Sequence, residues 1–368
     1  MQGIEALRKG YSMELKDQNV LFFARATQHG GTENVILQLC EIFNPVVNKI
    51  VVVSADGFSV EKLRPFGIKH YSIPDIEEKK PSTILAVSKK LKQIIADEHI
   101  TVIHTHHRMA AFYIRFLGLH KFCYFINTSH NTFTNKRILT RYSYKKANLI
   151  ACGEMVKKNL NDVYGLEKVS VIHNAVKPFC DGIIPDEIIS NDKKVGKYLI
   201  GNVGRLSEQK GMEYFINAVP GGLSRHPDAQ FYIIGSGENA EKLKEMSKGL
   251  PITFMGYRTD IQNLMSQLDL IVLSSLWEGL PLTPIEAFSV GKTIVATGVD
   301  GTIEIVKNME NGLLVRAKDS EELTEKINWM IEHPEEKKQM EIKAKEKYEQ
   351  DFSFNKLSES YVDFYRSL

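Results

Sequence analysis

The stretch DLIVLSSLWEGLPLTPIEAF, residues 269–288, contains the features that decide the fold. It opens with an apolar run typical of a buried parallel strand, and a turn rich in glycine and proline then leads into a helical segment. The carboxyl end of such a strand is where doubly wound sheets bind their ligands. Glu278 and Glu286 flank this turn, so we expect both at a binding site.

A purely structural interpretation of the second glutamate stays open. Thr283, Pro284 and Glu286 have the spacing of a capping box, in which Glu286 would accept the backbone N–H of Thr283. Capping does not account for Glu278, which precedes a turn whose backbone N–H groups suit a phosphate. Carboxylates on both sides of such a turn could accept hydrogen bonds from the hydroxyls of a sugar and a ribose.

Strand-like apolar runs alternate with amphipathic helical stretches along the chain, which predicts an α/β fold with doubly wound parallel sheets. The alternation breaks at 177–197, which is rich in Pro, Asp and Asn, and then resumes. We therefore expect two Rossmann-like domains separated by a linker. Their predicted bounds are 1–176 (with 1–18 as an extension), 177–197 for the linker, 198–350 for the second domain and 351–368 for a last amphipathic helix. The predicted strands are 19–24, 49–55, 102–106, 123–130, 149–153, 170–176, 198–204, 229–235, 252–256, 269–275, 293–298 and 312–315.

Further candidate residues follow the strand at 198–204. Gly204 precedes two cations, Arg205 and Lys210, that could bind opposite sides of a diphosphate, although surface cations would produce the same spacing. The turns GSGEN (235–239) and MGYRTDI (255–261) end other strands at the same edge of the sheet. GSGEN lacks the third glycine of GxGxxG and no acid ends the expected strand, which disfavours a dehydrogenase.

The N-terminal half offers its own strand-end residues. Gly30 and Gly31 follow the first strand and would let backbone approach a ligand. The segment HTHHR (104–108) ends another strand, and His130-Asn131 ends the next. Alternate strand residues point to opposite faces, which argues against a metal site, so these histidines are either buried structural groups or groups that face a ligand. The candidate pocket or acceptor residues here are Arg108, His130 and Asn131.

Charge is distributed unevenly although the net charge is only +2. Residues 101–150 contain no Asp or Glu, but they carry eight Lys or Arg and five His. Such a block attracts phosphate, nucleic acid or an anionic membrane surface, unless it is only a solvated basic face. No reader module with interleaved aromatic and basic residues is recognisable, so we expect no nucleic-acid partner.

Targeting and redox signals are few. The sequence contains no apolar run long enough to cross a membrane, and its first residues lack the apolar core of a signal peptide. Cys40, Cys123, Cys152 and Cys180 match no metal or redox spacing, which suggests reduced thiols in a cytoplasmic protein.

Taken together, these motifs resemble a known family. The paired Rossmann-like halves, Gly-Gly after the first strand, HxH at 104–106, GRLxxxKG at 204–211 and the glutamates spaced as E-x7-E are similar to the retaining, nucleotide-sugar-dependent glycosyltransferases of family 4, which have the GT-B fold. The similarity runs from about residue 19 to the end. It departs from the family pattern at Thr283-Pro284, where an apolar pair is more usual, and a proline there remains compatible with a helix start.

The resemblance implies roles for particular residues. His106, Arg205, Lys210 and Glu278 would be catalytic: the two cations would bind the donor diphosphate in place of a metal ion, while Glu278 and His106 would contact the transferred sugar. Glu286 would hold the ribose hydroxyls. The other residues expected along the donor are Gly30, Gly31, Gly204, Tyr257, Arg258, Gly279, Leu280 and Pro281.

The resemblance also implies a substrate class. We expect transfer of a sugar from a UDP-sugar, or another nucleoside-diphosphate sugar, with no cofactor and no metal. The basic block favours an anionic, lipid-linked acceptor, and hence a peripheral enzyme at the inner face of the membrane in exopolysaccharide, capsule or cell-wall synthesis. The alternatives are a soluble or protein acceptor, a GT-B nucleotide-sugar 2-epimerase and a non-catalytic partner subunit.

Overall fold

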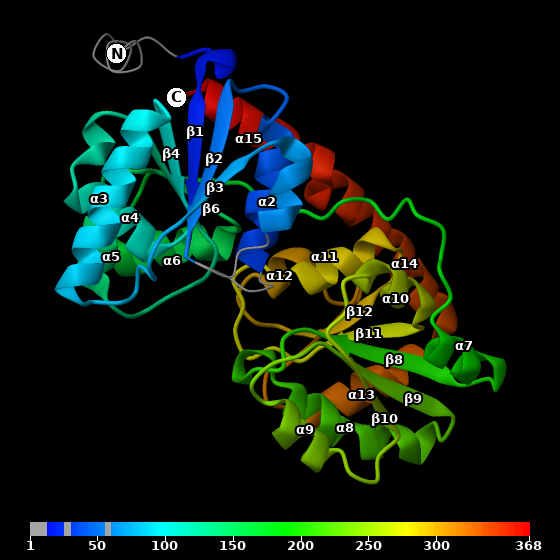
Figure 1. The fold of residues 1–368 in the computed structure, drawn as a ribbon. Coiled ribbons are helices and arrows are strands. Elements are labelled where there is room, and N and C mark those ends of the chain that lie inside the picture. The colour runs from blue at the N-terminus through cyan, green and yellow to red at the C-terminus, as the bar shows by residue number, and fades with distance from the viewer. Residues whose placement is uncertain (1–12, 26–30, 56–59) are drawn as a thin grey trace. The chain divides into compact units, whose positions relative to one another are not determined.

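A computed structural model of the chain describes residues 13–25, 31–55 and 60–368 (Figure 1). The chain divides into two compact units. The N-terminal unit comprises the described residues up to Asn174 together with Leu357–Leu368, and the C-terminal unit comprises Ala175–Lys356. Each unit contains one parallel sheet covered by helices, which confirms the predicted fold class.

The N-terminal unit contains a seven-stranded sheet in the order β3-β2-β1-β4-β5-β6-β7, in which all pairs are parallel. The central strands are apolar and fully buried, as expected of strands covered on both faces. The strands are β1 Asn19–Phe23, β2 Lys49–Ser54, β3 Lys69–Ser72, β4 Val102–Thr105, β5 Tyr124–Ser129, β6 Asn148–Ala151 and β7 Val169–Val171.

Helices cover both faces of this sheet. In Figure 1, α2 and α15 lie on one side of the strands, and α3 and α4 lie on the other. Aromatic packing between Phe43 of α2 and Tyr365 of α15, with ring centres 4.2 Å apart, joins the first of these layers. The helices of the unit are α2 Gly31–Phe43, α3 Pro81–Asp97, α4 Arg108–Phe116, α5 Arg137–Tyr144, α6 Glu154–Tyr164 and α15 Phe354–Arg366, whose first residues belong to the other unit.

The C-terminal unit contains a six-stranded parallel sheet in the order β10-β9-β8-β11-β12-β13. Its strands are β8 Tyr198–Val203, β9 Ala229–Ile234, β10 Ile252–Gly256, β11 Leu270–Leu273, β12 Ile294–Thr297 and β13 Leu313–Val315. Its helices are α7 Glu187–Lys194, α8 Met212–Arg225, α9 Ala240–Met246, α10 Ile261–Gln267, α11 Leu282–Ser289, α12 Thr302–Ile305, α13 Ser320–Glu332 and α14 Pro334–Lys347. The helices α8, α9 and α13 lie on one side of the sheet, and α10, α11 and α14 lie on the other (Figure 1).

Each sheet has a point where the strand order reverses. In the first sheet the chain builds β1, β2 and β3 outward and then returns to place β4 on the other side of β1. In the second, β8, β9 and β10 are followed by β11 on the other side of β8. Ligands of open parallel sheets bind at these switch points, beyond the carboxyl ends of the strands. The loops after β8 and β11 are those that contain Lys210 and Glu278.

Two local features, an edge strand and a short helix, were not anticipated from the sequence. The edge strand β3 was not predicted, because KHYS is short, polar and only partly buried, so it lacks an apolar pattern. The segment 177–197 is not featureless, since it contains α7, whose N-terminus is capped by Asp186. All four cysteines are free thiols. No helix in the described part of the chain is long and apolar enough to span a bilayer.

The position of β3 depends on one buried carboxylate. Glu98, at the end of α3, is 4% exposed and accepts hydrogen bonds from Lys49 of β2 and from Lys69 and Tyr71 of β3. The bond from Lys49 is the strongest of several that lower the pKa of Glu98 to about 2. A lowered pKa means that the ionised form stabilises the folded state above the ordinary glutamate pKa and that this contribution is lost as the pH falls toward 2.

We therefore predict that Glu98→Gln lowers the free energy of unfolding at pH 7 by about 1 kcal/mol, because both lysines remain partly solvated. Thermal melts of the wild-type protein and of Glu98→Gln from pH 7 to pH 3 check this prediction. The difference in melting temperature should shrink below pH 4.5. A difference that stays constant over this range would contradict the assignment of the stabilising charge to Glu98.

Candidate functional site

The main candidate site lies at the switch point between β8 and β11 in the C-terminal unit. Lys210, in the loop after β8, forms an ion pair with Glu278, in the loop after β11, with Nζ 2.5 Å from Oε1. The two side chains are only 16% and 6% exposed. The structure thus brings together two predicted residues that are 68 positions apart in the chain.

Glu278 is surrounded by hydrogen-bond donors that its sequence context did not reveal. The hydroxyl of Ser275 donates to Oε1 over 2.6 Å, so that oxygen also has a neutral partner. Among the residues that the structure describes, the other oxygen, Oε2, accepts only a long contact of 3.4 Å from the Gln209 amide. The backbone N–H of Glu278 donates to Asp300 Oδ2 at 3.0 Å. The carboxylate is therefore fixed through one oxygen and its backbone, while Oε2 keeps capacity to accept another donor.

Polar side chains beneath the loops hold Lys210 in place. Asn202, buried in β8, donates to the Ser274 hydroxyl, which in turn donates to the backbone carbonyl of Lys210 at 3.0 Å. Close backbone contacts also hold the turn at Gly204 and the turn at Gly279. A Cβ at Gly235 would lie 1.9 Å from the Gly204 carbonyl oxygen, and the equivalent distance from Gly301 to the Gly279 carbonyl is 1.8 Å. Only glycine fits at these two positions.

The start of α11 corrects one prediction. The helix begins at Leu282 with Pro281 as its N-cap, and no side chain caps it. Thr283 is not the N-cap, because its hydroxyl donates to the Val203 carbonyl of β8 over 3.3 Å. The expected capping box is therefore wrong: the threonine ties the helix to the sheet, and the carboxylate of Glu286 has no capping role.

Glu286 lies in the first turns of α11, and burial raises the pKa of its carboxyl to about 7 although the neighbouring Lys210 acts in the opposite direction. This carboxyl therefore gains or loses a proton near neutral pH. Gly279, Leu280 and Pro281, which were predicted to lie beside the donor, form the buried turn between Glu278 and this helix.

Arg205 is placed differently from Lys210. It is exposed at the carboxyl end of β8 and forms no ion pair with another residue that the structure describes. Its guanidinium can therefore bind an anion without first giving up a partner. Gly204, which precedes it, lies against the side chain of Lys210, since a Cβ there would be 3.3 Å from the lysine Cδ.

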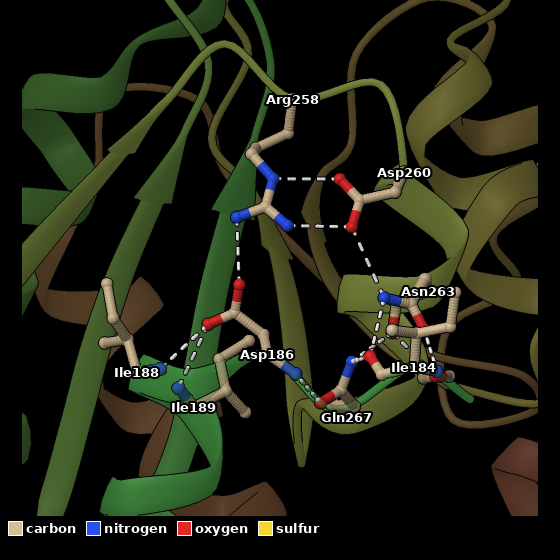
Figure 2. Close-up of polar contacts among 9 residues, drawn as sticks. Ile184, Asp186, Ile188, Ile189, Arg258, Asp260, Asn263 and Gln267 are labelled. Atoms are coloured by element: carbon tan, nitrogen blue, oxygen red, sulfur yellow. Dashed lines mark hydrogen bonds and ion pairs between the residues drawn. The ribbon is translucent and has the colours of Figure 1, made fainter.

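Arg258 is held within the C-terminal unit by two carboxylates. Figure 2 shows its guanidinium paired with both oxygens of Asp260, at 2.8 Å each, and with Asp186 at 2.9 Å. Asp186 also caps α7, so the arginine connects the segment before α7 to the turn after β10. Its predicted contact with a donor would compete with these bonds. Tyr257 beside it is 47% exposed.

In the N-terminal unit, predicted residues gather after β4 and β5. His106 is 4% exposed, and its Nδ1 lies 3.1 Å from His130 Nε2. Burial keeps the pKa of His106 well below the ordinary value, and it lowers that of His130 to about 4. Both imidazoles are therefore neutral at pH 7.

The remaining predicted residues of this unit have separate surroundings. Arg108 donates to Asn135 and Thr140 on the α5 side, while Asn131 is exposed. Gly31 begins α2, and Gly30 lies outside the described residues.

Sequence reasoning missed several residues that complete the C-terminal site. Ser275 and Gln209 contact Glu278 directly, and Asp300 holds its backbone from the loop after β12. The motif GVDG after a predicted strand was the only available signal for Asp300, which has a positive φ of 38°. In the described ranges, no group of three or more His, Cys, Asp or Glu could hold a metal ion.

The pKa of Glu286 yields a test that needs no substrate. A raised pKa means that ionisation destabilises the folded state once the pH exceeds the ordinary glutamate value. We predict that Glu286→Gln raises stability by about 1–2 kcal/mol at pH 8, since the residue is half-buried, and by much less at pH 5. Denaturant melts at both pH values check this, and a larger gain at pH 5 than at pH 8 would contradict the assigned shift.

Comparison with known proteins identifies the family of this chain. A family model described as Glycosyltransferase Family 4 matches residues 29–178, and one described as Glycosyl transferases group 1 matches residues 184–347. Among solved structures, Anabaena Alr3699/HepE in complex with UDP-glucose is similar with a TM-score of 0.81 and 21% identity, over 95% of this chain and 100% of that one.

Curated relatives match mostly in part. An Escherichia coli UDP-Gal:alpha-D-GlcNAc-diphosphoundecaprenol alpha-1,3-galactosyltransferase is 33% identical over 41% of this chain and 42% of its own length. The Escherichia coli O-antigen biosynthesis glycosyltransferase WbnH is 24% identical over 95% of this chain and 99% of its own length. The first four relatives are matched over 42% to 61% of their lengths. With a matching family model in each half and the two-sheet architecture, the chain belongs to the family 4 glycosyltransferases with the GT-B fold.

Proposed function

We propose that this protein is a retaining glycosyltransferase that moves a hexose from a UDP-sugar to a lipid-linked or polysaccharide acceptor without a metal ion. The observation that carries the proposal is the buried Lys210–Glu278 ion pair at the β8/β11 switch point, with Arg205 exposed beside it. This arrangement provides two cations for a diphosphate and a carboxylate for sugar hydroxyls at one sheet edge.

The choice of UDP rests on similar proteins. One relative is named for UDP-Gal, and one similar structure was solved with UDP-glucose. Glu286 suits the ribose of such a donor, because a carboxyl with a pKa near 7 can accept hydrogen bonds from a pair of hydroxyls once it is ionised. Oε2 of Glu278 suits the hydroxyls of the transferred sugar, because its present contact is long.

Sugar transfer separates positive charge from negative charge in the transition state, and the site has groups that would stabilise the negative charge. As the bond from the anomeric carbon to the diphosphate oxygen breaks, positive charge grows on the sugar and negative charge on the leaving group. Arg205 and Lys210 would stabilise the diphosphate through fixed positive charges. The acceptor oxygen forms the new bond from the face that the diphosphate leaves, and the acceptor proton passes to a phosphate oxygen. This order of events retains the configuration at the anomeric carbon.

The proposed acceptor is anionic and lipid-linked. The relative named for a diphosphoundecaprenol acceptor and the relative named for O-antigen biosynthesis support this class. The acid-free block at 101–150 supports it from the chain itself, since an anionic acceptor and an anionic bilayer would both favour positive charge. The protein would then act as a peripheral enzyme at the inner face of the membrane.

The outer face of α5 has the composition expected of a membrane contact. Arg137, Arg141 and Lys145 are all exposed at intervals of four residues. Beside them, Ile138 is 88% exposed and Tyr142 is 41% exposed. An isoleucine so exposed next to three cations matches an interfacial helix, which inserts apolar groups while its cations meet anionic headgroups.

Residues of α4 extend this face. Arg115 lies over the Tyr142 ring at 5.2 Å, and Phe112 contacts both Tyr142 and Phe116, which is 57% exposed. The combined α4/α5 face therefore offers aromatic groups and cations together, the mixture that favours the interface of a bilayer.

Turnover tests the donor site. We predict that Lys210→Ala and Glu278→Gln each reduce sugar transfer or donor hydrolysis by about 100-fold or more, because each removes a group aimed at the reacting part of the donor. Calorimetry with UDP, GDP and ADP in EDTA should show binding of UDP by the wild-type protein and weaker binding by Lys210→Ala.

A matched control is available on the same unit. Lys242→Ala breaks an exposed ion pair with Glu213 of similar length, 2.7 Å, and should leave turnover unchanged. Near-normal turnover in both site variants would overturn the proposal. Formation of a 2-epimer from donor alone would replace it with the epimerase alternative, and transfer only to soluble or protein acceptors would replace the lipid-linked acceptor.

Vesicle binding tests the α4/α5 face. We predict that wild-type protein co-sediments with vesicles that contain phosphatidylglycerol and not with pure phosphatidylcholine vesicles. Arg137→Glu combined with Arg141→Glu should weaken this binding by on the order of tenfold or more, because each basic residue near an anionic surface contributes about 1 kcal/mol.

The control for vesicle binding is the same charge change elsewhere. Lys193→Glu combined with Lys194→Glu alters two exposed lysines of α7 in the other unit and should preserve most of the binding. Ile138→Ser tests the apolar part of the face separately. Equal binding of the wild-type protein to neutral and anionic vesicles would contradict the membrane proposal and would leave the donor site untouched.

A further inference from the structure

Three histidines form a continuous group in the N-terminal unit, of which His104 and His106 are buried and His130 is partly buried. His104 is within β4, His106 follows that strand and His130 follows β5. The rings of His104 and His106 stack with centres 4.3 Å apart at an angle of 28°. The rings of His106 and His130 are nearly parallel, at 18°, with centres 5.3 Å apart. His106 thus contacts one imidazole through its face and another through its edge.

The innermost ring is fixed at both nitrogens. His104 Nδ1 lies 2.8 Å from the Tyr365 hydroxyl of α15, and its Nε2 lies 2.7 Å from the Thr128 hydroxyl of β5. Tyr361, one helical turn before Tyr365, reaches the same threonine at 3.4 Å. His104 is fully buried and has no free ring nitrogen, so it serves as a rigid surface on which His106 stacks.

The middle ring is fixed at one nitrogen only. His106 Nδ1 bonds to His130 Nε2 over 3.1 Å, whereas His106 Nε2 is buried and has no partner in the described part of the molecule. An unpartnered buried nitrogen costs free energy unless a ligand supplies its hydrogen bond. His106 Nε2 is therefore the atom of this group that a bound ligand would satisfy.

The protonation of the two histidines links the hydrogen bond between them to the state of His106 Nε2. Burial lowers the pKa of both rings, so each is neutral at pH 7 and carries a single N–H. One hydrogen lies between His106 Nδ1 and His130 Nε2. If it belongs to His130, then His106 carries its hydrogen on Nε2; if it belongs to His106, then Nε2 is bare. The bond thus decides whether Nε2 donates or accepts.

We propose that His130 is a positioning residue for His106: the bond at its Nε2 fixes the orientation of the His106 ring and ties the tautomer that His106 presents to the transferred sugar to the tautomer of His130. This inference rests on the proposed glycosyltransferase function and on the contact between His106 and the transferred sugar that the family resemblance implies. His130 has no role of its own on the sugar. It acts through a single hydrogen bond, while the stack on His104 keeps the ring in its plane.

The chemical benefit is that His106 Nε2 has one hydrogen-bonding role, either donor or acceptor, in every molecule. A neutral imidazole in solution exchanges between two tautomers, so an unfixed His106 would offer a donor in some molecules and an acceptor in others. A sugar hydroxyl that requires a donor, or one that requires an acceptor, would then bind productively to only a fraction of the protein molecules. Because small misplacements of a contacting group cost on the order of 100-fold in rate, the second histidine has a direct effect on turnover.

The experiment compares His130→Leu with His130→Gln in the full-length protein. Leucine keeps much of the volume and removes the hydrogen bond, whereas the glutamine amide can replace it in either direction. We expect His130→Leu to lower the kcat for donor hydrolysis at least about tenfold with little change in KM, and His130→Gln to recover most of the rate. Long-range ¹H–¹⁵N spectra of histidine-labelled protein should show one tautomer of His106 in the wild type and a mixture in His130→Leu.

Two readouts separate this inference from the function on which it rests. UDP calorimetry should be unchanged in both His130 variants, because the diphosphate residues lie in the other unit. A wild-type protein that neither binds UDP nor turns over a donor would overturn the proposed function itself. If the wild type is active but His130→Leu keeps full activity, or keeps a single His106 tautomer, the positioning role is wrong. Tyr365→Phe, which removes a bond to His104 only, should leave the His106 tautomer unchanged.

Discussion

The ion pair between Lys210 and Glu278 is the interaction on which the candidate site depends. Two charges at 16% and 6% exposure are costly to remove from water unless they pair and accept further hydrogen bonds. Ser275 and Gln209 donate such bonds to the Glu278 carboxylate. Asp300 holds the backbone of Glu278, and the chain from Asn202 through Ser274 holds the backbone of Lys210. The site is consequently preorganised before any ligand binds. In the proposed function, a diphosphate would meet a lysine whose backbone is already fixed, so little reorganisation would remain for the moment of reaction.

The N-terminal unit contains a group of neutral polar side chains in place of a buried ion pair. Three of its histidines, His104, His106 and His130, lie where a charge would be costly, so desolvation lowers their pKa values and hydrogen bonds and stacking take the place of ion pairs. The helix α15 takes part in this group through Tyr361 and Tyr365, which explains why the last helix carries buried aromatic residues with polar tips. Its packing fills the layer beside α2, so the final residues of the chain complete the core of the first unit.

Charged side chains therefore occur in three different settings in this protein. The C-terminal unit buries one ion pair and leaves Arg205 exposed, the arrangement that suits an anion held at a fixed position. The α4/α5 face exposes its cations around Ile138 and Tyr142, which suits a diffuse anionic surface that needs no fixed geometry. The Arg258–Asp186–Asp260 cluster is structural in this state, because every contact it makes joins segments of one unit.

The sequence by itself determined the two parallel sheets, nearly all of their strands, the loops that carry Lys210 and Glu278 and the helix that carries Glu286, because apolar periodicity and turn residues are local signals. It did not determine β3, whose polar residues are held by Glu98 from a distant helix. It also predicted a capping box at Thr283 that the structure replaces with a bond to Val203. Only the tertiary structure decided the partners of Glu278 and the His106–His130 bond, since these contacts join loops that are brought together by the strand order and not by spacing along the chain.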